Sequence, residues 1–390
     1  MRPVEALALR GVALFFALGG ESALAQAAGD EVARQPASLA VIATFFAAAI
    51  IVLFGARWAA ERAHVFLYAH VEIRDPNGGW HGFSLSGAHL SAAALLGLPT
   101  LMLTQGDAAF LWIAGMLAGW PLLALLLARR LHNLGMLTFT DAIAWRLQGR
   151  ALRVLAATSA LAVTLLYLTA QIIGAGQLLG ALFGLEYWLA AMIVGSLMML
   201  TALYCGRVAF TWLAVVKTMA LLPLLTLLAA LALWTSGFSA AELGEARPFV
   251  AAASADFLAM RSPVERWSLG LTLFFGLSGL PHLLMRFTAA SARSARIARQ
   301  GGLWAGVWTG IFSGLLLLIW LGLSRLPETA SAMQNLALRD NSNLALLYLA
   351  ESMGNGPLMG VTAAVLLIAL LTVAVGLGHA AAAAVAHDVY

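Results

Sequence analysis

The chain contains repeated apolar runs, each long enough to cross a lipid bilayer. A hydrocarbon core about 30 Å thick needs about 20 apolar residues in a helix. Only 10% of the residues are charged, against about 25% in soluble domains. The sequence therefore predicts an all-α polytopic membrane protein with about nine transmembrane helices, at 38–57, 82–105, 108–128, 151–182, 187–205, 209–235, 267–287, 303–324 and 358–386.

The first 25 residues have a different character from these runs. Arg2 and Arg10 accompany a short apolar core, GVALFFALGG, and small residues at 23–25 resemble a cleavage site. This pattern is typical of a secretory signal. We interpret 1–25 as a signal peptide and 26–390 as a single transmembrane domain that starts outside.

The charges of the connections agree with that orientation. The predicted cytoplasmic connections at 57–81, 129–153, 206–208 and 286–302 hold thirteen arginines, whereas the outer loops hold five. Cytoplasmic loops are enriched in basic residues. We expect a multi-pass protein of a bacterial-type inner (plasma) membrane, with the lipid bilayer and not nucleic acid as its partner.

Two of the predicted crossings are interrupted. The crossing at 82–105 contains SLSGAHLSAA, with Gly87 and His89, and the crossing at 267–287 contains GLSGLPH. Non-helical backbone at membrane depth is tolerated only where protein or a wet cavity satisfies it. Interrupted helices at matching positions of two inverted halves indicate the midplane binding site of a secondary transporter.

Several stretches, in order along the chain, resemble the sodium/solute symporter family, most closely its acetate (monocarboxylate) permease branch. They are GWPLLALLLARRLHNLGMLTFTDAIAWRL (119–147), LYLTAQIIGAGQLLGALFGLEYW (166–188), TWLAVVK (211–217), GLPHLLMRF (279–287) and HDVY (387–390). The resemblance implies an inverted-repeat fold of five plus five helices. It assigns an extra helix to 38–57, the first repeat to 82–235 and a partial second repeat to 267–386. The second repeat is expected to be incomplete, because the family's C-terminal helices are absent from these residues.

The function implied by the resemblance is cation-coupled symport of a small monocarboxylate such as acetate. The coupling ion is sodium or a proton, and we expect no cofactor, no metal site and no enzymatic activity. An unwound helix after Pro281 presents free N–H groups to a carboxylate. The candidate substrate-binding residues are Gln171, Ser278, Gly279, Pro281 and His282. For Gln171 and His282, plain interhelical hydrogen bonding is an equally open interpretation.

The candidate ion-coupling residues are His89, Ser91 and Ala383. The resemblance implies an aspartate where this chain has His89, and hydroxyls where it has Ala382 and Ala383. Sodium requires oxygen ligands, so the sodium site is depleted, leaving the carbonyls of 86–90 and Ser91. A histidine can instead carry a proton.

Two cations and two further function classes complete the sequence interpretation. We expect Arg286 and Lys217 to extend towards the inner interface, with anion or coupling-ion contact as the alternative for each. A degenerate, non-transporting solute sensor or subunit is the alternative function. A remote alternative is an intramembrane serine protease, with Ser278 as nucleophile and His379 as base.

Overall fold

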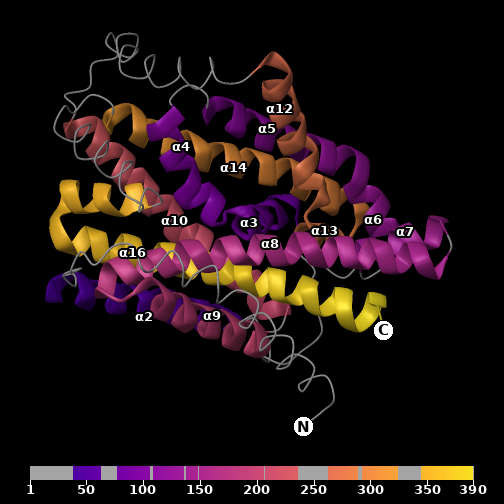
Figure 1. Ribbon diagram of the computed structural model, residues 1–390, viewed down its shortest axis with the longest axis horizontal. Coiled ribbons are helices and arrows are strands. Elements are labelled where there is room, and N and C mark those ends of the chain that lie inside the picture. Colours follow the sequence, from indigo (N-terminus) through magenta and orange to yellow (C-terminus); the bar gives the residue numbers. More distant parts are fainter. Residues whose placement is uncertain are drawn as a thin grey trace.

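The computed structural model describes residues 38–62, 77–105, 109–135, 138–147, 149–205, 207–235, 262–288, 292–323 and 344–389. The expected signal peptide lies outside these residues. Figure 1 shows the helical elements, which are α2 (Leu39–Arg62), α3 (Gly78–His89), η1 (Ala93–Gly97), α4 (Leu98–Gln105), α5 (Ala109–Leu122), η3 (Leu123–Ala128), α6 (Arg129–Leu134), α7 (Phe139–Leu147), α8 (Arg150–Phe183), α9 (Tyr187–Tyr204), α10 (Arg207–Thr235), α12 (Pro263–Gly276), η5 (Leu277–Gly279), α13 (Pro281–Leu284), η6 (Met285–Phe287), α14 (Ala295–Leu323), α16 (Ala345–Ala383) and η8 (Ala384–Val389).

The predicted all-α polytopic architecture is confirmed in the described residues. Five helices are long and apolar enough to cross a membrane, and two bent helix pairs raise the number to as many as seven. Two shorter apolar helices, Leu39–Ile51 and Tyr187–Leu203, coincide with the remaining predicted crossings. The largest difference in length is in α16, which begins at Ala345 and contains Pro357, whereas we expected a start at 358.

Local sequence signals set the ends of several helices. The Asn77 side chain accepts a hydrogen bond from the Trp80 N–H at 2.8 Å and caps α3. Ser262 and Glu265 form a reciprocal capping box at the start of α12. Gly184 ends α8 with a φ of 67°, a left-handed conformation that glycine adopts without a steric penalty.

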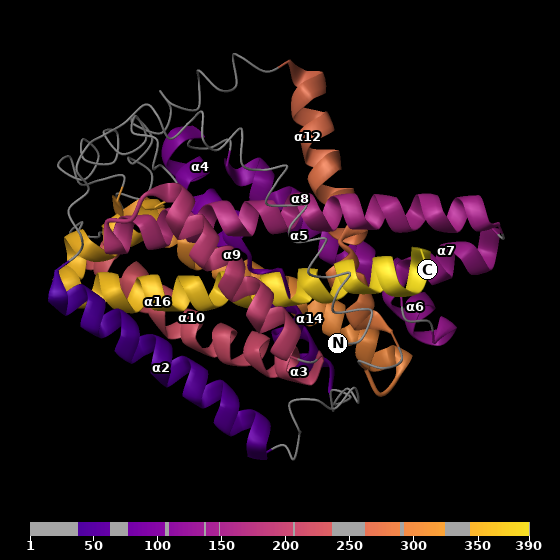
Figure 2. The ribbon, with the colours of Figure 1, turned by 60° about the horizontal axis from the view of Figure 1, so that its bottom comes forward.

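Helix α3 lies in the middle of the bundle and packs against α14 and α10 (Figure 1). Gly87 allows the close approach to α10, because a Cβ at this position would overlap the Ala214 carbonyl oxygen and the Thr218 hydroxyl. Helix α16 packs against α10 and also against α2, α8 and α9 (Figure 2). The glycine therefore fixes how closely the first broken helix meets its scaffold.

Both predicted interruptions are present in the structure. Gly78–His89 and Ala93–Met102 meet at an angle of 74°, and Leu90 between them is extended, with φ −63° and ψ 98°. Trp267–Gly279 and Pro281–Phe287 meet at 47°, with Leu280 extended. These are the first and sixth crossings after α2, the positions expected for two inverted halves.

Candidate functional site

The two helix breaks present a pair of buried imidazoles. His89 ends α3, and His282 is the second residue of α13. The ring centres of Trp120 and His89 lie 5.4 Å apart in an edge-to-face arrangement, and those of Tyr167 and His282 lie 5.6 Å apart. Neither nitrogen of His89 has a hydrogen-bond partner among the described residues, and His282 has at most a weak one, the Ala88 backbone. Buried polar atoms without partners are costly, so the pair is suited to receiving a ligand.

Helix α8 supplies the polar groups that hold the first break. The Gln171 amide oxygen accepts a hydrogen bond from the Ala92 N–H at 2.9 Å, and the Tyr167 hydroxyl donates to Ser91 Oγ at 2.6 Å. The amide nitrogen of Gln171 donates to the Tyr167 carbonyl at 3.4 Å. The Gln171 side chain thus forms an interhelical hydrogen bond to the backbone at the first break. Ser91, at the same break, is hydrogen-bonded to the Tyr167 side chain of α8.

Lys217 lies in the interior, which contradicts the expected extension towards the inner interface. Its side chain is 0% exposed. The ammonium donates hydrogen bonds to the Leu90 carbonyl, at the first break, and to the Ala369 carbonyl of α16 at 3.0 Å. The reason is the length of α10, which begins at Arg207, so ten residues, or about 15 Å of helix, precede the lysine.

Arg286 is also interior, and the interfacial interpretation is wrong for it too. The side chain is 5% exposed and donates to the Thr211 hydroxyl at 3.0 Å and to Ser84 Oγ. The guanidinium carbon lies 5.2 Å from the centre of the Phe210 ring. Since the second half-helix turns into η6, the arginine faces α3 and α10 instead of the membrane surface.

The residues around the breaks carry an excess of positive charge. Lys217 and Arg286 are buried there with two imidazoles, and the carboxylates of the described residues lie elsewhere. Of these, Glu186, Glu265 and Glu351 are exposed, and Asp141 and Asp388 lie beyond the far end of α16. A buried charge requires a partner, so the arrangement suits an anionic ligand.

Among the described residues, the structure gives the remaining predicted site residues no hydrogen bond to a polar side chain. The Ser278 hydroxyl donates to the Phe275 carbonyl of its own helix at 2.7 Å, Gly279 is exposed, and Pro281 opens α13. Ala383 is the last residue of α16. It stands fourteen positions beyond Ala369, or about 21 Å along the helix.

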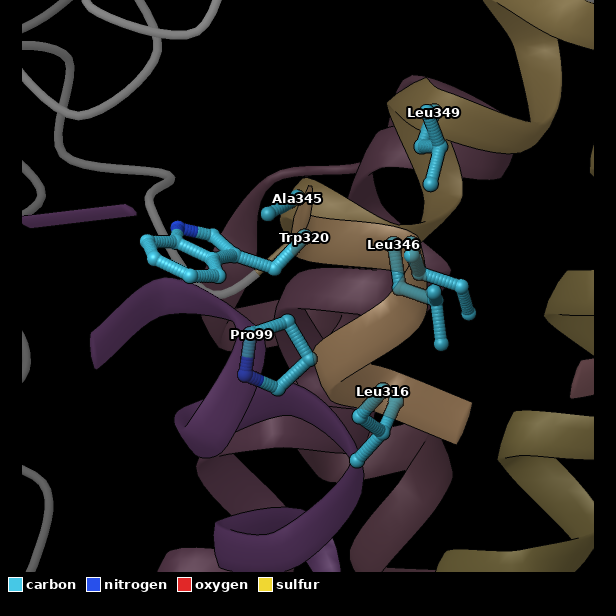
Figure 3. Close-up of a pocket in the computed structure, with 7 residues that line it drawn as sticks. Pro99, Leu316, Trp320, Ala345, Leu346 and Leu349 are labelled. Carbon is cyan, nitrogen blue, oxygen red and sulfur yellow. The ribbon is translucent and has the colours of Figure 1, made fainter. Parts of the chain in front are cut away.

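A small pocket between α4, α14 and α16 lies away from the breaks (Figure 3). Its volume is about 10 Å³, and it is lined by Pro99, Leu316, Ile319, Trp320, Ala345, Leu346 and Leu349. These side chains are apolar, and the space suits at most about one water molecule. It is therefore a poor candidate for binding a carboxylate.

A second polar group joins the ends of α7, α8 and α16, and we call it the α7–α16 cluster (Thr138, Asp141, Arg153, His387 and Asp388). Asp141 contacts His387 Nε2 at 2.8 Å and Arg153 at 3.1 Å, and the Thr138 hydroxyl donates to Asp388 at 2.8 Å. Burial acts to raise the pKa of Asp141, but hydrogen bonds from His387 and Thr138 outweigh it and lower the pKa. Asp141, His387 and Asp388 each place one ligand atom within 4.8 Å of the others, yet Arg153 already neutralises Asp141.

The comparisons with known proteins agree with this fold. The sodium:solute symporter family matches residues 75–390. A solved structure, described as the substrate-bound outward-open state of a Na⁺-coupled sialic acid symporter, is 14% identical in sequence. It has a TM-score of 0.68, with 90% of this chain and 75% of that chain covered. At this identity the likeness shows the fold.

The family match excludes the enzyme class among the functions left open by the sequence. It covers both broken helices and the buried basic residues around them. The protease interpretation of the GLSG motif is therefore excluded, and the hydroxyl of Ser278 is bonded within its own helix. This chain belongs to the sodium:solute symporter family.

Proposed function

We propose that the protein is a secondary transporter that carries a small monocarboxylate such as acetate together with a coupling cation. One observation carries the proposal: two helix breaks converge on a buried set of basic groups that has no carboxylate of its own among the described residues. A substrate carboxylate would supply the missing negative charge.

The side chains at the breaks account for carboxylate recognition better than a helix end does. Helix α13 has only four residues before the backbone tightens into η6, so its dipole is small. The imidazole nitrogens of His89 and His282 can donate to carboxylate oxygens, and hydrogen bonds to a charged group are the stronger kind. We therefore assign substrate binding to His282 and His89, with Gln171 as the residue that holds the break.

A small acid suits the neighbouring aromatic rings. Trp120 and Tyr167 lie against the two imidazoles, and their rings could contact the methyl group of acetate once the site opens. Alternating access would then rock the two broken helices against their scaffold. The setting that we propose is the inner membrane of a bacterial-type cell, across which gradients of sodium ions and protons exist.

The test is uptake of [¹⁴C]acetate by proteoliposomes at pH 8, where the acid is almost entirely ionised. Protein-free liposomes measure diffusion of the undissociated acid, which must be subtracted. We expect saturable uptake that propionate inhibits and the neutral acetamide does not. His282→Leu should weaken acetate binding about tenfold or more, since hydrogen bonds to charged groups contribute about 1.5–3 kcal/mol.

Thr158→Val is the matched control, because Thr158 is exposed on α8 and bonds only to its own helix. A folded protein that binds acetate without uptake would support the second candidate function, a non-transporting sensor. The observation that favours this second candidate is Lys217, which bonds the first broken helix to α16. Absence of both binding and uptake would contradict the monocarboxylate assignment.

A further inference from the structure

The ammonium of Lys217 lies between two backbone carbonyls, and carbonyl oxygens at broken helices are the kind of ligand that a coupling cation can take. One carbonyl belongs to Leu90, whose extended conformation takes it out of the regular helix, and the other belongs to Ala369 on α16. We propose that Lys217 is a tethered coupling cation, and that a proton bound to it replaces the sodium ion implied by the family. This inference rests on the proposed transport function, and it goes beyond that function by naming the ion and the residue that carries it.

The residues present do not fit sodium at this position. Both carbonyl oxygens already accept hydrogen bonds from the ammonium, and a second cation on the same oxygens would be repelled at close range. The nearby hydroxyls of Thr218 and Thr372 donate to carbonyls of their own helices, Ala214 and Ile368, at 2.7 Å. Sodium would have to displace the lysine to gain oxygen ligands.

The surroundings of Lys217 explain why a proton can carry the coupling. His89 of α3 and His282 of α13 face the site, and Arg286 follows in η6. Tyr167 of α8 lies against His282. Two other helices that pack against α10 also carry titratable residues. On α16 these are Glu351 and His379, which stand eighteen and ten positions from Ala369. On α14 they are Arg296 and Arg299, in its first turns. The described side chains of α2 include none. No acidic side chain among the described residues is shown to face Lys217, so in the proposed cycle the charged form is stabilised by the two carbonyls and by the substrate anion when it is bound. Without the anion, burial and the basic neighbours favour loss of the proton.

The proposed cycle conserves charge and atoms. With substrate bound, the –NH₃⁺ group holds Leu90 and Ala369 together, so the first broken helix is joined to α16. When the broken helix rocks away and the anion leaves, the group loses its partners and releases one proton to water, becoming –NH₂. It takes up another proton from the opposite side in the next cycle. One monocarboxylate anion moves with one proton, and the net transport is electroneutral.

The first experiment needs no transport. Lys217 is the single lysine in the 390 residues, so protein labelled with [¹⁵N]lysine, carrying a lysine-free tag, gives one side-chain NMR signal in nanodiscs. We expect no ²²Na⁺ binding by the wild type, and ²²Na⁺ binding by Lys217→Ser, in which the two carbonyls are free. Displacement of the lysine signal by Na⁺, or ²²Na⁺ binding by the wild type, would overturn the proposal even if the substrate were misassigned.

The second experiment uses [¹⁴C]pyruvate, a monocarboxylate that stays ionised and does not diffuse through the bilayer. An inward proton gradient should drive uptake by wild-type proteoliposomes. Replacement of Na⁺ by K⁺, or a membrane potential set with valinomycin, should not change the uptake. Lys217→Gln should lose accumulation against a gradient but keep exchange of internal for external pyruvate. If no monocarboxylate is exchanged, the proposed function is contradicted. The ²²Na⁺ binding result still tests whether Lys217 takes the place of the sodium ion.

The variant His89→Gln distinguishes Lys217 from His89, the other candidate carrier of the coupled proton. This variant should slow uptake, because His89 faces the substrate, yet its accumulation should still depend on the proton gradient. Loss of that dependence in His89→Gln, with retention in Lys217→Gln, would transfer the proton to the histidine. Misfolding is excluded by requiring exchange activity and a monodisperse elution profile from each variant.

Discussion

The side chain of Gln171 completes the hydrogen bonding of a helix break that belongs to another element. Its amide oxygen accepts from the Ala92 N–H at 2.9 Å in a fully buried setting. The break removes the usual helical acceptor for that N–H, and no water is available in a packed bundle. The amide thus acts as a substitute for one turn of helix.

Replacement of Gln171 by leucine should therefore destabilise the protein. The buried Ala92 N–H would lose its acceptor, which costs about 1–3 kcal/mol, and the melting temperature should fall by a few degrees. Thr158→Val on the same helix should leave it unchanged. An equal effect of both variants in a thermal unfolding assay would show that Gln171 has no special part in holding the break.

At the residue level, the sequence predicted where some polar side chains lie and misplaced others. The interior position of His89, Gln171 and His282 could be predicted, because an ionisable or amide group within an apolar run faces the bundle interior. Lys217 and Arg286 were misplaced, because their distance from a helix end seemed short enough for extension to the interface. The missed signal was local: Ala214, one turn before Lys217, faces Gly87, which places that side of α10 against α3.

Helix α3 depends on one glycine for its contact with α10. In Gly87→Ala the new methyl group would overlap the Ala214 carbonyl oxygen, which belongs to a backbone that cannot easily move. Overpacking of this kind typically costs about 1–3 kcal/mol, so we expect a lower melting temperature and slower uptake.

Gly276→Ala is the matched control for that variant. Gly276 ends α12, and a Cβ there meets nothing within 4 Å. This change should leave the melting temperature the same or slightly higher, because alanine favours the helix. If the two alanine variants behave alike, close α3–α10 packing is not what requires the glycine.

The α7–α16 cluster predicts how stability depends on acid. The pKa of Asp141 is lowered in the folded protein, so its ionised form contributes stability above the ordinary Asp pKa of about 3.9. That contribution is lost as the pH falls through the folded-state value. Wild type should therefore melt above Asp141→Asn at pH 7, and the difference should shrink below about pH 4. A difference independent of pH would contradict an electrostatic role for Asp141.

Among the elements, the breaks were the most predictable feature. Gly, Ser and Pro within apolar runs marked both positions, and the structure places the extended residues at Leu90 and Leu280. The lengths were less predictable, since apolar composition does not reveal where a helix leaves the membrane. The backbone carbonyls that accept hydrogen bonds from Lys217 could not be predicted from the sequence, because every residue type supplies a carbonyl.

For the whole molecule, the orientation in the membrane remains a prediction from charge. Cys205 is the single cysteine and caps the end of α9, next to the predicted cytoplasmic connection at 206–208. A membrane-impermeant maleimide should label it in inside-out vesicles and not in right-side-out vesicles. Cys205→Ser is the blank, and labelling from the outside alone would reverse the assigned topology.

The length of α8 has a consequence for the lipid around the protein. Its 34 residues span about 51 Å at 1.5 Å per residue, while the hydrocarbon core is about 30 Å thick. Even a tilt of 40°, near the upper limit for membrane helices, leaves about 39 Å to accommodate. Figure 2 shows the helix running out to α7, at the end that begins with Arg150. Longer acyl chains would draw Arg153 towards the apolar layer, so bilayer thickness would act directly on the hydrogen bond between Arg153 and the His387 carbonyl.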